Sequence, residues 1–317
     1  MHSSELNWHN LDHYLCVPIG YRFIDRIQLV SQTEALGFKA VSTQDWYFRI
    51  HFPGNPVMPG VFIMESIEQT AIAHLASMGS VCIVDSCSSM RIFSSVRPGD
   101  SLRTHVTISS ETSDGFSIAG EAYIQDNQDE NRLVCTMRFV LRDAAISREA
   151  DSDGKSVSSE LLKDHLDEIL PIRPDHLDNL IADPLEYRFI DSAAAIPGKR
   201  SWGFKNVSSQ EWYFPICCRD EICMPAAFLI EAIMQTGVLV VTTIHPGRFK
   251  LMMYNSCTNL QIYDSARPGD RVETYVELKR FRNGIANYHG IAYCADRLLC
   301  ELHFILVAPD EMQQVRR

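Results

Sequence analysis

The sequence comprises 317 residues, of which 46% are hydrophobic and 22% are charged. This composition is typical of a globular protein that can bury a sizeable core. The net charge of −11 argues against a nucleic-acid-binding protein, and no cluster of lysine and arginine indicates a membrane-binding surface.

The first half of the chain predicts one α+β unit. An amphipathic helix is expected over residues 4–15, and one or two strands follow it. The loop "PGNPVMPG" (53–60) leads into a long apolar helix that starts close to Pro59, where the missing N–H of proline costs least. Alternating apolar positions then predict antiparallel strands, which would wrap a sheet around the helix. These strands are expected at residues 102–112, 116–126 and 132–143.

The second half of the chain repeats the first. The segment "GFKAVSTQDWYF" (37–48) recurs 166 residues later as "GFKNVSSQEWYF" (203–214). The segment "DSCSSMRIFSSVRPGD" (85–100) recurs 170 residues later as "NSCTNLQIYDSARPGD". Two tandem units are therefore predicted rather than a solenoid, because the period is a whole domain. The predicted divisions are a first repeat at 1–145, a polar linker at 146–170 and a second repeat at 171–317. A helix is expected in the linker at 161–170. In the second repeat, a helix is expected at 173–185 and strands at 271–281, 285–295 and 297–308.

Residues 225–244 form an apolar run that is almost long enough to span a membrane. Pro225 lies at its start, as Pro59 lies at the start of the first long helix, and predicts that a helix begins there. Glu231 and Gln235 lie near its middle, and a carboxylate at that depth in a bilayer is costly. A helix that is apolar on all sides is also what a globular core buries. The sequence favours a buried core helix over a membrane span.

The ten cysteines are scattered and form no CxxC pair, so neither a zinc site nor another metal site is expected. Residues 1–20 contain Glu5, Asp12 and three histidines, which does not resemble a secretory signal. Free thiols in a reducing cytoplasm are therefore expected.

Each long helix carries a carboxylate among its apolar residues, Glu65 in the first repeat and Glu231 in the second. Burial disfavours the charged form and raises the pKa of such a group, and groups perturbed in this way gather at functional sites. Gln69 and Gln235 follow four residues later, on the same helical face, where an amide can orient the carboxyl group. The alternative is a pair of structural carboxylates that reach solvent at the seam between the repeats.

His51 precedes the loop that starts the first long helix, and Gly60 falls in the first turn of that helix. The N–H of Gly60 has no intrahelical acceptor there and carries the positive end of the helix dipole. Such an N–H can stabilise an oxyanion. A lone histidine is more often structural, but His51, a buried glutamate and this N–H together favour a catalytic site.

These residues resemble the 3-hydroxyacyl-[acyl-carrier-protein] dehydratases of type II fatty-acid synthesis. The resemblance rests on "HFPGNPVMPG" (51–60) followed by Glu65, with "YRFIDR" before it and "RPGD" after the helix. It covers most of repeat one and, more weakly, repeat two. It implies the hotdog fold, a long helix wrapped by an antiparallel sheet, and therefore a double hotdog for the whole chain. Position 65 is a glutamate rather than an aspartate. In this the sequence resembles the plain dehydratase branch of the family and not the dehydratase/isomerase branch.

In this family two hotdogs share a site, with the histidine from one and the acid from the other. The resemblance therefore implies that His51 pairs with Glu231. Repeat two has "CCRDEICMPA" (217–226) where repeat one has the histidine loop, so that Cys217 stands in place of His51. This division is similar to the double-hotdog dehydratase domains of polyketide synthases. Glu65, Gln69 and Cys217 would form a second or vestigial site, and a nucleophilic role for Cys217 is the less favoured interpretation.

The resemblance implies that a 3-hydroxyacyl thioester is dehydrated to a trans-2-enoyl thioester in fatty-acid, polyketide or polyunsaturated-acid synthesis. His51 would remove the α-proton, and the Gly60 N–H would stabilise the thioester oxygen. Glu231, oriented by Gln235, would protonate the departing hydroxyl group. No cofactor is implied beyond the phosphopantetheine that carries the substrate, on an acyl carrier protein as the expected partner or in coenzyme A.

Two other functions stay open on the same fold, an acyl-thioesterase and a non-catalytic hotdog that binds acyl chains or acts as a scaffold. The intact His51 loop argues against both. The assembly is expected to be a monomeric double hotdog or a homodimer.

Overall fold

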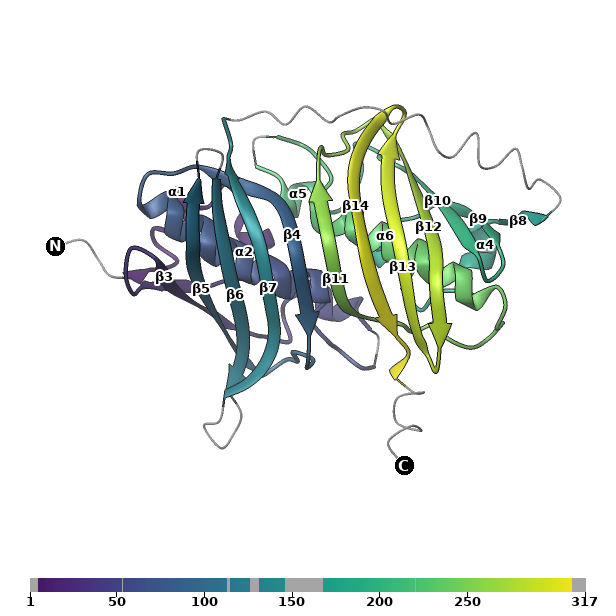
Figure 1. Ribbon diagram of the computed structural model, residues 1–317, viewed down its shortest axis with the longest axis horizontal. Coiled ribbons are helices and arrows are strands. Elements are labelled where there is room, and N and C mark those ends of the chain that lie inside the picture. Colours follow the sequence, from purple (N-terminus) through teal and green to yellow (C-terminus); the bar gives the residue numbers. More distant parts are fainter. Residues whose placement is uncertain are drawn as a thin grey trace. The chain divides into compact units, whose positions relative to one another are not determined.

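The computed structural model describes residues 5–52, 54–112, 115–125, 131–145, 168–219 and 221–309. The chain divides into two compact units, each with one long helix (Figure 1). Unit 1 comprises Met1–Arg148 and Trp212–Glu221, and unit 2 comprises Glu149–Glu211 and Ile222–Arg317.

Unit 1 is built around helix α2 (Gly60–Ser77), whose side chains are mostly buried. Its sheet is antiparallel with the strand order β1-β2-β3-β5-β6-β7-β4, and α2 packs on strands β2 to β7. The strands are β1 (Glu5–Leu6), β2 (Arg26–Leu29), β3 (Glu34–Ala40), β4 (Cys82–Ile92), β5 (Ser101–Thr112), β6 (Gly115–Gln125) and β7 (Asn131–Asp143). The short helical segments are α1 (Leu11–Tyr14), η1 (Ile19–Tyr21), η2 (Trp46–Arg49) and α5 (Phe214–Cys217).

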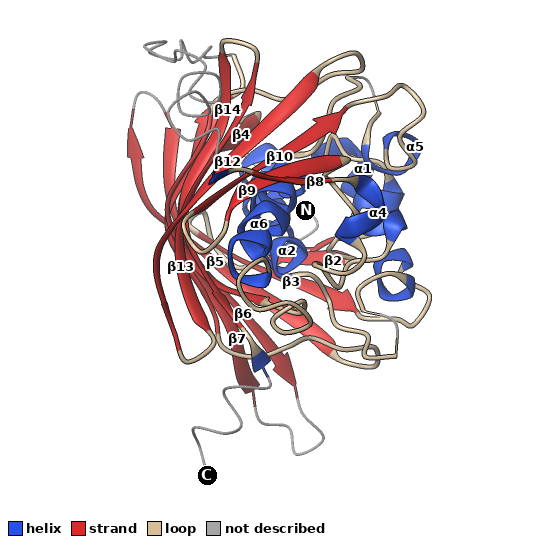
Figure 2. Ribbon diagram, turned by 90° about the vertical axis from the view of Figure 1, so that its right-hand side faces the viewer, coloured by secondary structure: helices blue, strands red, loops and turns tan. Residues whose placement is uncertain are grey.

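Unit 2 is built in the same way around helix α6 (Ala226–Thr242). Its antiparallel sheet has the order β11-β14-β13-β12-β10-β9-β8, and α6 packs on β9, β10 and β12 to β14. Figure 2 shows that within each unit the strands curve around one side of the long helix. The strands are β8 (Leu170–Ile172), β9 (Ser192–Ile196), β10 (Arg200–Asn206), β11 (Met253–Ile262), β12 (Arg271–Arg282), β13 (Ile285–Cys294) and β14 (Arg297–Val307), and the short helices are α4 (Pro174–Leu177) and η4 (Leu185–Tyr187).

The predicted α+β double hotdog is confirmed, because each unit wraps one helix in one antiparallel sheet. The six strands predicted from alternating apolar residues agree with β5, β6, β7, β12, β13 and β14 to within one residue at each end. Both long helices begin directly after the prolines that predicted their starts, Pro59 and Pro225.

The two short amphipathic helices are predicted too long. In residues 4–15, Leu6 pairs with Ile27 in the sheet, and only Leu11–Tyr14 is helical. In residues 173–185 the helix ends at Leu177, and hydrogen-bonded turns carry the chain onward to Pro184. The buried leucines of both segments are spaced as in a helix, but a strand and turns bury them equally well. The linker helix predicted at 161–170 lies outside the described residues except for its last three, of which Leu170 begins β8.

The segment Trp212–Glu221 belongs to repeat two in sequence but packs with unit 1. The Trp212 ring meets the Trp46 ring edge-on at 5.1 Å, and Arg219 forms an ion pair with Asp12 at 3.2 Å. Gly20 permits this close packing, because a Cβ atom there would approach Ile216 to 2.8 Å. The compact units therefore differ from the predicted repeats in this one segment.

The remaining bulk features bear on the sequence predictions for membranes and thiols. Within the described ranges, no helix is long and apolar enough to cross a membrane, and α6 is a buried helix of its unit. All ten cysteines are free thiols.

A glycine allows each long helix to approach its sheet closely. In unit 2, Thr236 on α6 hydrogen-bonds Thr274 on β12 at 2.6 Å, directly over Gly203 on β10. We expect Gly203→Ala to lower the free energy of unfolding by about 1–3 kcal/mol, because its Cβ would collide with both threonine hydroxyls and overpack the core. Chemical denaturation measures this change. Gly247→Ala is the comparison for backbone strain, because it has open space around it but a positive φ of 80°, so that any loss of stability there comes from the backbone and not from overpacking.

Candidate active site

The His51 ring is held in one tautomer by the loop that follows it. Its Nδ1 lies 2.9 Å from the carbonyl oxygen of Val57. A carbonyl oxygen only accepts hydrogen bonds, so Nδ1 carries the proton, and Nε2 carries the lone pair of the neutral ring. Burial lowers the pKa of His51 to about 4, even though the bond to Val57 acts in the opposite direction. His51 is therefore a neutral imidazole at neutral pH, with an unprotonated Nε2.

The "RPGD" turn of repeat one supports the histidine loop. The Arg97 guanidinium donates a hydrogen bond of 2.8 Å to the side-chain oxygen of Asn55, and the Met58 N–H donates to the carbonyl oxygen of Val96. The Val57 N–H donates a hydrogen bond of 3.0 Å to the His51 carbonyl oxygen. The loop is therefore tied both to itself and to the neighbouring turn, which fixes His51.

Gly60 is the first residue of the 18-residue helix α2. Its N–H belongs to the first turn, which has no carbonyl acceptor within the helix, and the positive end of the helix dipole lies there. Helix α2 thus presents a hydrogen-bond donor at the end of the same loop that begins with His51.

The acid of unit 2 is Glu231, on helix α6, and its side chain is 7% exposed. The Tyr187 hydroxyl donates a hydrogen bond of 3.2 Å to its Oε1. Burial, and then the charge of Asp183, raise the pKa of Glu231 to about 8, while the Tyr187 bond acts in the opposite direction. Glu231 is therefore protonated at neutral pH and able to donate a proton.

Gln235 is anchored to the backbone next to Tyr187. Its amide nitrogen donates to the Tyr187 carbonyl oxygen at 2.7 Å, and its amide oxygen accepts from the Phe189 N–H at 2.8 Å. These bonds fix the backbone that carries the Tyr187 hydroxyl. Any orienting effect of Gln235 on Glu231 therefore passes through Tyr187.

Unit 1 brings together the three residues of the predicted second site. Glu65 accepts hydrogen bonds from the Tyr21 hydroxyl at 2.8 Å and from Gln69 at 3.2 Å. Burial raises the pKa of Glu65. Burial also raises the pKa of Cys217, with the charges of Cys218 and Glu65 as further causes. Cys217 is therefore a protonated thiol next to a carboxyl group, which makes it a poor base and a poor nucleophile.

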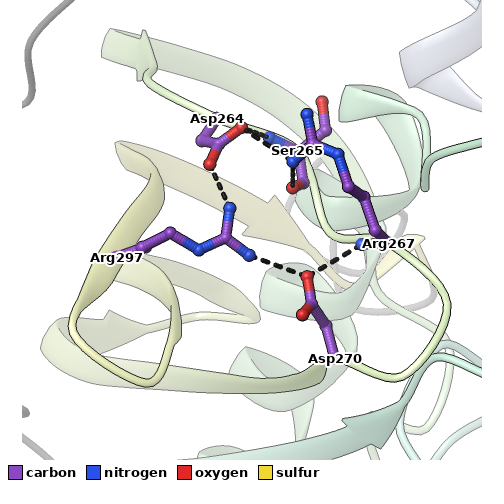
Figure 3. Close-up of polar contacts among 5 residues, drawn as sticks. All are labelled: Asp264, Ser265, Arg267, Asp270 and Arg297. Atoms are coloured by element: carbon purple, nitrogen blue, oxygen red, sulfur yellow. Dashed lines mark hydrogen bonds and ion pairs between the residues drawn. The ribbon is translucent and has the colours of Figure 1, made fainter. Parts of the chain in front are cut away.

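The "RPGD" turn of repeat two makes different contacts (Figure 3). The Arg267 side chain bonds Asp264 and the Ser265 carbonyl oxygen, at 3.3 and 3.2 Å. Arg297 lies between Asp264 and Asp270 and forms an ion pair with each. Repeat one has Ser94 at the position of Asp264. The second turn is thus bound to the β13–β14 hairpin, whereas the first supports the histidine loop.

Sequence reasoning missed three residues beside the acids. Tyr21 and Tyr187 lie in the repeated "YRFID" segment, but their hydroxyl contacts with Glu65 and Glu231 arise from packing across 44 residues. Asp183 gave no signal, because a lone aspartate before a proline is typical of a turn.

Known proteins resemble both repeats of this chain. The family of FabA-like domains matches residues 18–131 and 187–303, one stretch in each repeat. The chain is similar to the 3-hydroxyacyl-[acyl-carrier-protein] dehydratase FabZ of Chloroflexus aggregans, at 39% identity over 99 residues, which cover 29% of this chain and 69% of that protein. It is also similar to FabZ of Moorella thermoacetica, at 34% identity over 108 residues, which cover 32% and 76%.

A solved structure extends the likeness in fold to nearly the whole chain. The dehydratase domain from the CurJ module of curacin polyketide synthase has a TM-score of 0.61 at 11% identity, and the match covers 92% of this chain and 97% of that domain. The match of the FabA-like family itself spans well over half of the sequence. The chain therefore belongs to the family of proteins with FabA-like domains.

Proposed function

We propose that the protein dehydrates a 3-hydroxyacyl thioester to a trans-2-enoyl thioester. The observation that carries this proposal is geometric: His51 is held in one tautomer by its own loop, and Glu231 is buried on a long helix beside the Tyr187 hydroxyl. His51 is neutral because its pKa is lowered to about 4, and Glu231 is protonated because its pKa is raised to about 8. Elimination of water needs one base and one acid at the same pH, and these two groups supply them.

In the proposed reaction, His51 Nε2 takes the proton from the α-carbon. The electron pair moves towards the thioester oxygen, where the Gly60 N–H stabilises the developing negative charge. Glu231 then donates its proton to the hydroxyl group at the β-carbon, which leaves as water as the double bond forms. Protons and one electron pair move without net oxidation, so the proposed chemistry uses no redox cofactor or metal.

We propose that His51 acts with Glu231 rather than with its own neighbour Glu65. In unit 1 the Cys217 thiol, the repeat-two counterpart of His51, interacts with Glu65 of repeat one. This interaction supports a site in which the histidine position of one repeat faces the acid of the other. Applied to the reciprocal positions, this exchange pairs His51 with Glu231 and leaves Glu65 and Cys217 as a vestigial pair.

The proposed substrate is carried by phosphopantetheine on an acyl carrier protein, and the names of the FabZ relatives support this carrier. Coenzyme A offers the same thioester chemistry and is the alternative carrier. An experiment with both carriers separates the proposal from a thioesterase or a binding protein. Incubation with 3-hydroxyacyl and acyl thioesters should give enoyl product without free thiol. Release of thiol would indicate a thioesterase, and no conversion with either carrier would favour a non-catalytic protein.

The pH dependence of kcat/KM should be a broad plateau. The base must be deprotonated, so activity should rise as the pH passes through about 4, the pKa of His51. The acid must be protonated, so activity should fall as the pH passes through about 8, the pKa of Glu231. Initial rates between pH 4 and pH 10 test this. A rate that rises continuously through pH 8 would contradict an acidic role for Glu231.

A further inference from the structure

The two helix acids of this chain differ in the hydrogen bonds that they accept. In unit 1 both oxygens of Glu65 accept one, Oε1 from the Tyr21 hydroxyl at 2.8 Å and Oε2 from the Gln69 amide at 3.2 Å. In unit 2 the Tyr187 hydroxyl donates to Oε1 of Glu231 at 3.2 Å. Oε2 of Glu231 has no hydrogen-bond partner among the residues that the structure describes. The second repeat therefore leaves one oxygen of its acid without a donor.

The glutamine that follows each acid accounts for this difference. Both glutamines are clamped to the backbone in the same way, because each bonds the carbonyl oxygen of the tyrosine and the N–H two residues later, at 2.7 to 2.9 Å. Gln69 donates to Glu65 in addition, whereas the two hydrogen bonds of Gln235 both go to the backbone. Tyr187 is therefore the donor that holds Glu231, and Gln235 holds the backbone of Tyr187.

The Tyr187 hydroxyl decides which oxygen of Glu231 can carry the acidic proton. Burial raises the pKa of Tyr187 well above its usual value, so the hydroxyl keeps its own proton and acts as a donor. A neutral carboxyl group has one oxygen that only accepts hydrogen bonds and one that carries the proton. Because Oε1 accepts from Tyr187, the proton lies on Oε2. Glu231 is 7% exposed, and Oε2 is not one of the side-chain atoms that are fully enclosed without a partner, so a ligand can reach this oxygen.

We propose that Tyr187 is a positioning residue of the acid half of the site, whose hydroxyl fixes Oε1 of Glu231 so that Oε2 presents the proton to the departing hydroxyl group. This rests on the proposed function and deepens it, because it names the one oxygen that gives up the proton. The proton passes from Oε2 to the hydroxyl oxygen, and water leaves. The carboxylate that remains keeps its bond to Tyr187, which strengthens as the charge develops.

The same argument separates the two acids of the chain. Glu65 accepts a donor at each oxygen, an arrangement that suits a hydrogen-bond acceptor and leaves neither oxygen free to present a proton. Glu231 accepts one donor and keeps the other oxygen for its proton. The hydrogen-bond pattern alone thus favours Glu231 as the acid.

The first test is Tyr187→Phe in the full-length protein, which removes the hydroxyl oxygen and keeps the ring. A hydrogen bond to the charged form of an acid favours that form. Its loss should therefore lower the ionisation constant of Glu231 by about three- to tenfold, and the alkaline limb of kcat/KM should move to higher pH by the same factor. At pH 7 kcat should fall by about tenfold, because the proton is no longer fixed on one oxygen. A residue that only stabilised the fold would lower the rate without moving the limb to higher pH.

A direct titration of Glu231 tests the hydrogen bond without an activity assay. Carbon-13 NMR of protein labelled at the glutamate carboxyl carbon follows this titration, and Glu231→Gln assigns the signal. Placing 3-fluorotyrosine at position 187 keeps the ring and makes the hydroxyl a stronger donor, so it should move the titration to lower pH, opposite to Tyr187→Phe. Asp183 also acts on Glu231, but it is unchanged in every variant, so these shifts report the hydroxyl at position 187.

The matched control is Tyr21→Phe, which makes the same change beside Glu65. It should leave kcat/KM and its alkaline limb unchanged. A Glu231 titration that stays in place or moves to lower pH in folded Tyr187→Phe protein would overturn the proposal. If the titration moves to higher pH but the alkaline limb does not follow, Tyr187 holds a carboxyl group that is not the acid of the reaction, and the proposed function fails instead.

Discussion

His51→Ala and Glu231→Gln should each lower kcat/KM for dehydration by a factor of about 10² to 10⁴, whereas Glu65→Gln should leave most of the activity. The alanine removes the base, and the glutamine has no acidic proton to donate. Glu65 lies beside a Cys217 thiol whose pKa is raised, so its pair lacks a base. Single-turnover assays with a 3-hydroxyacyl thioester measure the chemical step for each variant.

The three variants also serve as experimental controls for one another. Glu231→Gln and Glu65→Gln make the same chemical change at equivalent positions of the two repeats. Each replaces a helix carboxyl group by an amide of the same shape, which can keep the hydrogen bond from the neighbouring tyrosine hydroxyl, so the melting temperature should change little. If Glu65→Gln is inactive and Glu231→Gln is active, the pairing of His51 with Glu231 is wrong. If both are inactive, both acids contribute to catalysis.

Gly60→Pro should lower kcat by a factor of about 10² to 10³, the usual effect of losing one oxyanion donor. Proline removes the N–H but suits the first position of a helix. The preceding Pro59 has φ −53° and ψ 140°, an extended conformation that a following proline tolerates. The loss should therefore appear in kcat, with little change in stability.

Two further substitutions separate the N–H from other effects of this change. Gly60→Ala keeps the N–H and should keep most of the activity. Ala226→Pro makes the equivalent change at the first residue of α6, where Pro225 has φ −56° and ψ 146°, and it should leave kcat unchanged. A full loss of activity in Gly60→Ala would show that space, and not the N–H, is what position 60 provides.

Local sequence signals were sufficient to predict the two long helices and the six long strands, and they indicated candidate residues for the site. Pro59 and Pro225 marked the starts of the helices because the missing N–H restricts where proline can stand. Alternation marked the long strands because one of their faces is buried. His51 and Glu231 were found because a histidine beside such a loop and a carboxylate within an apolar helix both conflict with a purely structural segment.

The features that sequence could not predict depend on which side chains meet after packing. The Tyr187 hydroxyl reaches Glu231 across 44 residues, and the Tyr21 hydroxyl reaches Glu65 in the same way. The apolar spacing of residues 4–15 is compatible with a helix, but pairing of Leu6 with Ile27 offered the same burial with sheet hydrogen bonds. In each case a tertiary contact decided between local structures of similar stability.

The packing of Trp212–Glu221 with unit 1 has a consequence for how this chain can diverge. The segment includes Cys217, which cannot act as a base in the way that a histidine can. Even so, the Trp212 ring packs edge-on against Trp46, and Arg219 forms an ion pair with Asp12. Natural substitutions in this segment should preserve the side-chain volumes and the packing contacts, whereas its reactive side chains can be replaced. A duplicated gene can thus discard the chemistry of one copy of a loop and still keep that loop, because the loop packs against the other repeat.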